Sequence, residues 1–274
     1  MATAASAQDR IAMATAELPD APTAQQAAPP SNSTPPVKAQ QQQQTDQQPT
    51  SDEVLRREEQ QRAFGVMPMF QTVSLANSKN IPPLRSKQKF HLMLKSTTDP
   101  FIFAQDAVLS GIGQARDTNS GTKIVTNPDG TQRKVRWGFG QGASGYFKRF
   151  GASYADTADG NFWGNAVLPV LLKEDPRYYR MGSGSFMRRF GYSATTAVWC
   201  RRDNGKWGPN YANVAGNFIS GGISNLYYPD EDSGVEKTVI GAMTVTAEGV
   251  IGSELIEFLP DIEHHFLKNR HPKQ

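Results

Sequence analysis

The chain has almost no cysteine, because Cys200 is the only one among its 274 residues. A single cysteine excludes an intramolecular disulfide and a zinc cluster built from cysteines. It can still be a nucleophile where a histidine lies beside it in the fold. Cys200 follows an apolar stretch with helical spacing, where a small buried thiol is the commoner role. We therefore expect Cys200 to be buried at the end of a helix that runs from about Phe186 to Arg202.

Aromatic residues are missing from the first 63 positions, whereas all 26 of them lie from Phe64 onward. The same stretch is rich in proline and holds a glutamine run at Gln40–Gln44. Ordering a residue costs roughly 1–2 kcal/mol of backbone entropy, and this composition buries too little apolar surface to offset that cost. The sequence predicts a disordered low-complexity tail over residues 1–63 and an extended linker over 64–85.

Long basic runs are also missing. The tail carries eight acidic and five basic residues, a formal charge of −3. Because the whole chain has a formal charge of +3, residues 64–274 carry +6. This surplus favours polyanions only weakly and no nucleic-acid recognition motif accompanies it, so we expect no nucleic-acid partner. Phosphate-binding glycine loops, nucleophile elbows, zinc-protease helices and dinucleotide fingerprints are absent too, and we predict no cofactor.

The first ten residues lack the apolar core of a secretory signal. Two explanations stay open: a cytoplasmic protein, or a signal that lies upstream of the start shown. A membrane span is also weakly indicated. Residues Tyr211–Tyr228 are uncharged over 18 positions, but their asparagines and serines oppose transfer into lipid, so a buried bundle helix is favoured and an integral membrane protein is the alternative.

Helical spacing dominates residues 86–270. Asp99-Pro100 predicts a helix start, and Phe101, Ala104, Val108 and Ile112 then recur at helical spacing and form an apolar face. We predict a mainly α fold, a compact bundle of about five to seven helices rich in glycine and alanine, preceded by the disordered tail.

Two turn signals interrupt the helical pattern. A proline-containing turn near Pro128, flanked by alternating residues, predicts a small inserted β-hairpin over about 123–135. Pro260 is expected to break the last long helix, which a capping pair at Ser233 and Glu236 opens.

Glycines recur through the segment from Gly142 to Gly164. Each one in a helix interior costs about 0.5–1 kcal/mol relative to alanine, so this density predicts close contact between helix backbones. Residues Tyr154–Phe162 also resemble Tyr211–Phe218. The similarity predicts two related helices packed through their small faces, with chance similarity as the alternative.

Acidic and histidine residues supply the candidates for catalysis or metal binding. Asp156 and Asp159 share one helix face, and Asp175 precedes a basic pair; acid–base catalysis is one role and pairing with nearby bases is the favoured alternative. Asp261, His264 and His265 form the densest titratable group. Adjacent histidines diverge by about 100° around a helix, which disfavours a shared metal, so a solvated helix end is favoured and no metal is predicted.

Basic residues beside aromatic ones recur in four places. Arginine binds phosphate in two-point fashion and aromatic rings suit a lipid interface, although the same pattern is typical of core helix ends. The candidate residues for binding an anion or lipid are Lys148, Arg149, Arg177, Arg180, Arg188, Arg189, Arg201 and Arg202.

Four strings in the sequence resemble a family of uncharacterised bacterial proteins over about residues 80–268. The strings are Ser110–Ala115, Lys148–Asp156, Glu174–Arg180 and Gly221–Pro229. The resemblance implies export to the cell envelope, because members commonly begin with a signal peptide and a low-complexity segment. It implies no activity, and the hairpin near Pro128 is an addition to the family's pattern.

The leading hypothesis is a non-enzymatic helical protein of the cell envelope, periplasmic or membrane-associated, whose basic and aromatic helix ends contact anionic lipid or another envelope component. One alternative is a hydrolase or metal-dependent enzyme that uses Asp156 and Asp159 or the group from Asp261 to His265. The other is an integral membrane protein.

Overall fold

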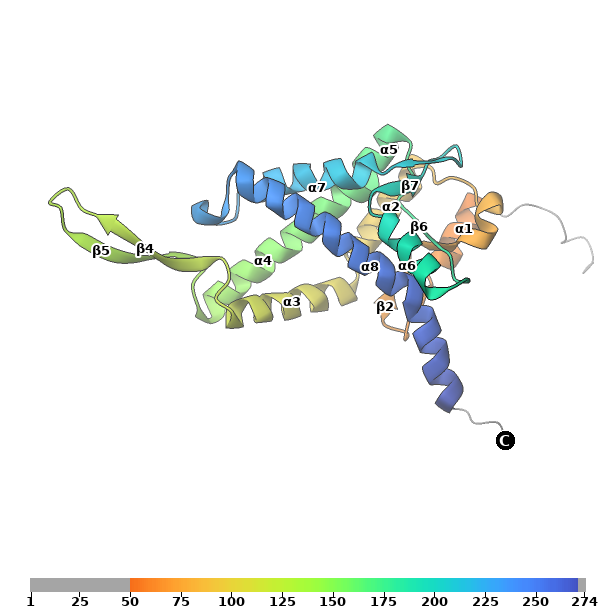
Figure 1. Ribbon diagram of the computed structural model, residues 1–274, viewed down its shortest axis with the longest axis horizontal. Coiled ribbons are helices and arrows are strands. Elements are labelled where there is room, and N and C mark those ends of the chain that lie inside the picture. Colours follow the sequence, from red (N-terminus) through yellow and green to blue (C-terminus); the bar gives the residue numbers. More distant parts are fainter. Residues whose placement is uncertain (1–49, 271–274) are drawn as a thin grey trace, which may run out of the picture. The chain divides into compact units, whose positions relative to one another are not determined.

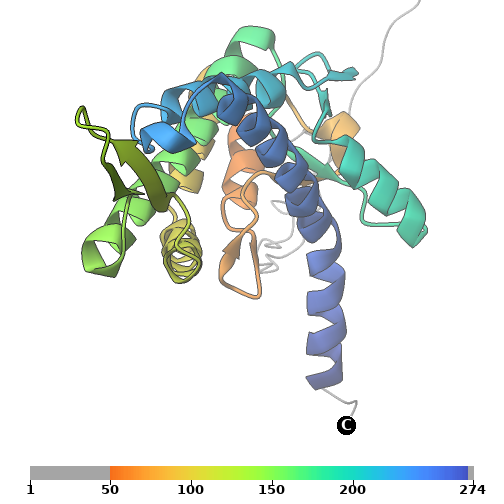
Figure 2. The ribbon, with the colours of Figure 1, turned by 60° about the vertical axis from the view of Figure 1, so that its left-hand side comes forward.

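A computed structural model describes residues 50–270 of the chain, and their side chains as far as Phe266. The fold is mainly α with short strands between the helices, as predicted (Figures 1 and 2). The α-helices are α1 (Ser51–Glu58), α2 (Ser86–Thr97), α3 (Pro100–Ala115), α4 (Gly142–Asn161), α5 (Leu168–Leu172), α6 (Phe186–Thr195), α7 (Tyr211–Ser224) and α8 (Val235–Arg270). A π-helical segment, η2 (Phe162–Val167), joins α4 to α5, and 3₁₀ turns lie at η1 (Leu75–Asn80) and η3 (Asp230–Asp232).

The strands form four separate two-stranded pairs. Three are antiparallel: β1 (Arg62–Ala63) with β2 (Met67–Pro68), β4 (Ser120–Thr126) with β5 (Gln132–Gly138), and β7 (Trp199–Arg201) with β8 (Trp207–Pro209). The fourth pair is parallel and joins β3 (Thr72–Ser74) to β6 (Tyr178–Arg180).

The segment before the first long helix is folded onto the rest of the protein. Leu55 of α1 and Phe70 are buried with Leu84 and Leu92 in one apolar cluster. Residues 50–85 therefore belong to the same compact unit as the helices. The predicted boundaries at residues 63 and 85 differ from this arrangement, because Leu55 and Phe70 become buried only against segments distant in sequence. The predicted tail up to residue 49 lies outside the described residues.

Local signals placed α3 and the hairpin correctly. Asp99 accepts a hydrogen bond from the backbone N–H of Phe101 at 2.9 Å, and α3 ends at Ala115. β4 and β5 pair from Ser120 opposite Gly138 to Thr126 opposite Gln132. The resulting hairpin extends beyond the helices (Figure 1).

Two helix ends differ from the prediction. α6 ends at Thr195, and Cys200 lies on β7, where it is buried. The helix does not reach Cys200 because the turn after Arg201 lets β7 pair with β8. α8 continues through Pro260, so the predicted break is wrong. Proline can bend a helix without ending it, and Figure 1 shows α8 changing direction along its length.

Close contact between two glycine-rich segments is present where η2 crosses α7. A Cβ atom added to Gly216 would lie 2.9 Å from the Cα of Gly164, which is closer than real side chains approach a backbone. Other glycines predicted to pack, such as Gly151 and Gly222, have no atom within 4 Å of an added Cβ. The small faces of α4–η2 and α7 therefore meet at particular glycines and not along their whole length.

The apolar stripe of α3 points outward. Val108 is 63% exposed and Ile112 is 43% exposed, whereas Asp106 and Ser110 on the opposite face are 1% and 3% exposed. Periodicity locates an apolar face but does not say whether that face meets the interior or the surroundings.

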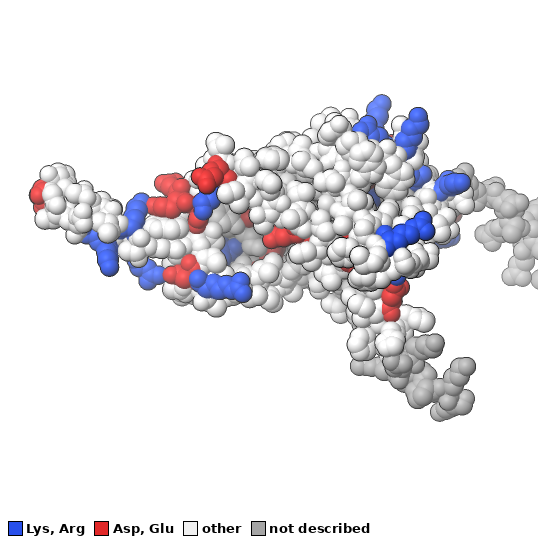
Figure 3. All heavy atoms as spheres, in the orientation of Figure 1, with Lys and Arg blue, Asp and Glu red and all other residues white. Residues whose placement is uncertain are grey.

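The same inversion continues on α8. Ile240, Met243 and Ile251 are exposed, while Ser253 and Glu257 are buried. On the face drawn in Figure 3, the surface over α7 and α8 is largely free of charged side chains, and charged side chains gather toward the two ends. One helix among the described residues, Val235–Phe266, is long and apolar enough to cross a membrane by length and composition.

Candidate functional site

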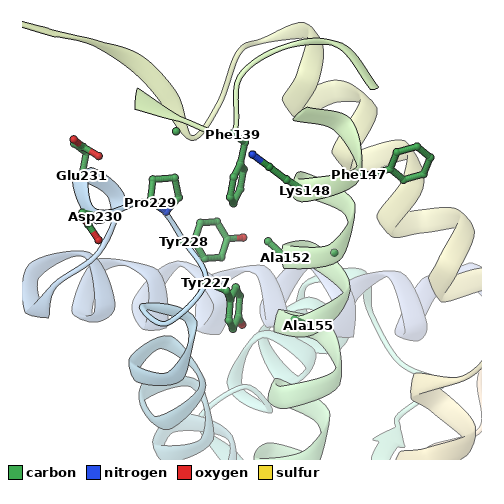
Figure 4. A pocket seen from close by; sticks show the side chains of 12 residues that line it. Phe139, Phe147, Lys148, Ala152, Ala155, Tyr227, Tyr228, Pro229, Asp230 and Glu231 are labelled. Atoms are coloured by element: carbon green, nitrogen blue, oxygen red, sulfur yellow. The ribbon is translucent and has the colours of Figure 1, made fainter. Parts of the chain in front are cut away.

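A groove of about 740 Å³ lies at the foot of the hairpin, between α4 and the loop that follows α7 (Figure 4). Its floor is made of small residues on α4, Gly151, Ala152 and Ala155. Phe139 and Tyr228 form a wall, with ring centroids 5.8 Å apart. Lys148, Asp230 and Glu231 also line the groove, so it combines an apolar floor and an aromatic wall with charged side chains.

The candidate carboxylate Asp156 lies behind this wall. Its two oxygens accept hydrogen bonds from the hydroxyls of Tyr227 at 2.6 Å and Tyr228 at 2.7 Å. Burial raises the pKa of Asp156, and the neighbouring Asp159 and Asp106 add to the rise. Burial also raises the pKa of both tyrosines, and so does Asp156. Both oxygens of Asp156 are therefore occupied by tyrosine hydroxyls, which suits a structural hydrogen-bonding role.

Further carboxylates between α3 and α4 are buried without a basic partner. Asp106 accepts hydrogen bonds from Ser153 at 2.8 Å and Thr157 at 3.4 Å through one oxygen. Its other oxygen, one oxygen of Asp159 and the hydroxyl of Ser110 are buried and have no hydrogen-bond partner among the described residues. Asp156 and Asp159 were expected to pair with nearby basic residues. Asp156 contacts tyrosine hydroxyls instead, and one oxygen of Asp159 has no partner among the described residues.

Asp175, the third candidate carboxylate, lies in a different cluster around β6. The Arg177 guanidinium donates to Asp175 at 2.7 and 2.9 Å and to Glu58 of α1 at 2.9 Å. Tyr179 donates to the same Asp175 at 2.7 Å. One guanidinium thus faces two buried carboxylates. Arg177 donates to Asp175 through two guanidinium nitrogens and to Glu58 through one, so it stabilises the Glu58 carboxylate less. Burial raises the pKa of Glu58 to about 7.

The second half of this cluster joins β6 and α6 to α8. Arg189 donates to Glu257 at 2.7 Å and to Asp261. Tyr178 donates to the other oxygen of Glu257 at 2.8 Å, and Arg180 donates to the Glu257 carbonyl at 2.9 Å. Glu257 is fully buried, so these contacts satisfy a charge that would otherwise destabilise the fold.

The eight predicted anion-binding residues fall into three groups. Arg149, Arg177 and Arg189 are buried and bound to other parts of the chain. Arg180, Arg201 and Arg202 are partly exposed, and the first two also make internal contacts. Lys148 and Arg188 are exposed and have no partner within residues 50–266. Figure 4 shows Lys148 directed toward Phe139, at the edge of the groove.

The fold splits the predicted group from Asp261 to His265. His264 and His265 are exposed, and Asp261 pairs with Arg180 and Arg189. Within the described part of the chain, no set of three or more histidine, cysteine or acidic residues is placed to hold a metal ion. Burial raises the pKa of Cys200 to about 12, so its thiol stays protonated at neutral pH.

Sequence patterns missed Glu58, Asp106 and Glu257, which lie at the centres of these clusters. The signal available for Glu257 was a carboxylate within an otherwise apolar helix, a placement that usually marks a buried partner. Glu58 carried no such signal, because its partner Arg177 is 119 positions away in sequence.

Comparisons with known proteins found no match. No family model, curated protein or solved structure matches this chain.

Proposed function

We propose that this protein is a non-enzymatic, lipid-associated helical protein of the cell envelope. The observation that supports it is the direction of the side chains on α3, α6 and α8. Their exposed faces carry large apolar residues, among them Met187 at 72% exposure, while their inner faces carry buried carboxylates, an arginine and hydroxyl groups. Contiguous apolar patches on a protein surface mark contact with lipid or protein.

The charges at the margins of this surface fit a lipid occupant. Arg188 is exposed on α6 beside Phe186 and Met187, and it has no partner in the described part of the chain. Between Thr238 and Pro260 of α8, Glu248 is the one exposed charged residue. An apolar face with a cation at its edge is typical of helices that lie in the headgroup region of a bilayer.

Vesicle flotation of the purified full-length protein tests this proposal. We expect Ile251→Gln, on the outer face of α8, to weaken binding to neutral phosphatidylcholine vesicles by roughly threefold to tenfold, because it removes one apolar contact with lipid. Val66→Gln is a matched control, since Val66 is 61% exposed and Ile251 is 62% exposed, but Val66 lies outside α3, α6 and α8.

Two outcomes contradict the proposal. One is a wild-type protein that stays in the aqueous fraction with every vesicle tested. The other is light scattering that finds a soluble oligomer which Ile251→Gln splits into monomers, because the outer faces would then be covered by copies of the same chain.

A further inference from the structure

The β4–β5 hairpin concentrates positive charge. Residues Ser120–Gly138 hold four basic side chains and one acidic side chain, a formal charge of +3. Residues 64–274 carry a formal charge of +6, so this hairpin holds half of it. The one acidic residue, Asp129, accepts hydrogen bonds from the hydroxyl and the backbone N–H of Thr131 at the tip, which lower its pKa. The hairpin is therefore a basic projection of the described part of the chain.

Each face of the hairpin combines cations with aliphatic side chains. The register places Lys134 opposite Ile124 on one face and Arg133 opposite Val125 on the other. Arg133 and Lys134 are exposed and form no side-chain hydrogen bond or ion pair within residues 50–266, while Ile124 is 62% exposed. Cations beside short apolar groups fit a surface that presents phosphates above hydrocarbon.

The body of the protein holds the base of this hairpin in place. The buried Arg149 of α4 donates to the Thr118 carbonyl at 2.6 Å, the Gly140 carbonyl at 2.6 Å and the Ser120 hydroxyl at 3.0 Å. These groups belong to both feet of the hairpin. Lys123, the basic residue of β4, forms an ion pair with Glu231. Arg149 and Lys123 thus support the base of the hairpin. Arg133 and Lys134 lie on its outer half and have no such partner within residues 50–266.

We infer that the β4–β5 hairpin binds the anionic phosphate headgroups of a lipid bilayer through Arg133 and Lys134. The inference rests on the proposed function, which brings the protein to lipid, and it assigns the headgroup contact to the hairpin in addition to the helix ends. A basic side chain near an anionic bilayer strengthens binding roughly fivefold, and salt screens the attraction.

Flotation with two kinds of vesicle tests the inference on the full-length protein. We expect wild type to bind vesicles containing phosphatidylglycerol more tightly than phosphatidylcholine vesicles. The double variant Arg133→Gln/Lys134→Gln should lose about 25-fold in affinity for the anionic vesicles and keep its affinity for the neutral ones. The control variant Lys79→Gln/Lys87→Gln removes two exposed charges outside the hairpin and should leave the preference for anionic vesicles intact.

The outcomes separate the two proposals. A double variant that binds anionic vesicles as wild type does, while both proteins bind neutral vesicles, overturns the hairpin inference and leaves the proposed function standing. A wild-type protein that binds neither vesicle overturns the proposed function.

Two further arms test the identity of the anion. Inorganic phosphate at matched ionic strength should not displace the protein from vesicles; displacement would show a small-anion site in place of a bilayer contact. Duplex DNA should not compete with anionic vesicles. Hairpin-dependent binding to DNA that is tighter than binding to vesicles would overturn the lipid assignment.

Discussion

Around β6, the buried guanidiniums of Arg177 and Arg189 each contact two carboxylates. The carboxylates of α3 and α4 differ, because within residues 50–266 they contact hydroxyl groups and no basic side chain. The first region joins segments far apart in sequence, because α1, β6, α6 and α8 all contribute to it. The second lies among α3, α4, η2 and α7, and η2 and α7 meet there through Gly164 and Gly216. The difference indicates that paired charges hold the first region, while close helix packing holds the second and must tolerate unpaired charge.

Removing the central cation of the first region should have the largest effect. We expect Arg177→Met to lower the free energy of unfolding by about 3–5 kcal/mol, because it leaves Asp175 and Glu58 buried without their partner. Urea denaturation followed by circular dichroism measures the change. Arg188→Met is the control, since Arg188 is exposed, and it should change stability by less than about 0.5 kcal/mol. Equal effects from the two variants would mean that the buried pairs do not hold this region.

The surplus carboxylate of the first region should make stability depend on pH. The pKa of Glu58 is about 7 in the folded protein and 4.5 when unperturbed, so the folded state binds more protons between these values. Its contribution to stability is fully present below about pH 4.5 and is lost as the pH rises through about 7, to a total of about 3 kcal/mol.

Glu58→Gln should flatten this pH profile, and the exposed Glu236→Gln should not. Thermal denaturation between pH 4.5 and 8 measures both variants. If the profile of Glu58→Gln is as steep as that of wild type, another group carries the dependence, and Asp156, whose pKa is also raised, is the next to replace.

Close packing in the second region should be sensitive to one methyl group. Gly216→Ala places a Cβ 2.9 Å from the Cα of Gly164, and we expect a loss of about 1–3 kcal/mol. Gly222→Ala is the matched control on the same helix, because its added Cβ meets no atom within 4 Å, and it should be neutral or stabilising. A Gly216→Ala protein as stable as wild type would show that α7 and η2 can separate freely.

The smallest expected effect has the opposite sign. Asp106→Asn should raise the free energy of unfolding by about 1 kcal/mol near neutral pH, because it removes a buried charge that has no basic partner. Asp175→Asn, the same change in the first region, should destabilise the protein, because it weakens the hold on Arg177. Denaturation of the two variants side by side measures this contrast, and two changes of the same sign would abolish the distinction between the regions.

Local features of the fold could be predicted because their causes are local. The cap at Asp99 followed by Pro100 starts α3, and the turn near Pro128 closes the hairpin, as the sequence indicated. Cys200 was correctly expected to be buried, but its strand was missed because β7 forms only when β8 is beside it. The candidate carboxylates were found individually by residue type. Their partners, Tyr227 and Tyr228 for Asp156 and Glu58 for the Asp175 cluster, could not be found from spacing.

The sequence by itself determined that the protein is mainly α, where α3 begins and that a hairpin interrupts the helices, since caps, prolines and turns act over a few residues. Only the tertiary structure decided which face of each helix is inside. Apolar periodicity is the same for a helix that turns Val108 inward or outward, and the choice depends on what packs against Asp106 and Ser110 on the other side. The partners of the buried charges were decided in the same way, because Arg177 and Glu58 meet only once the chain has folded.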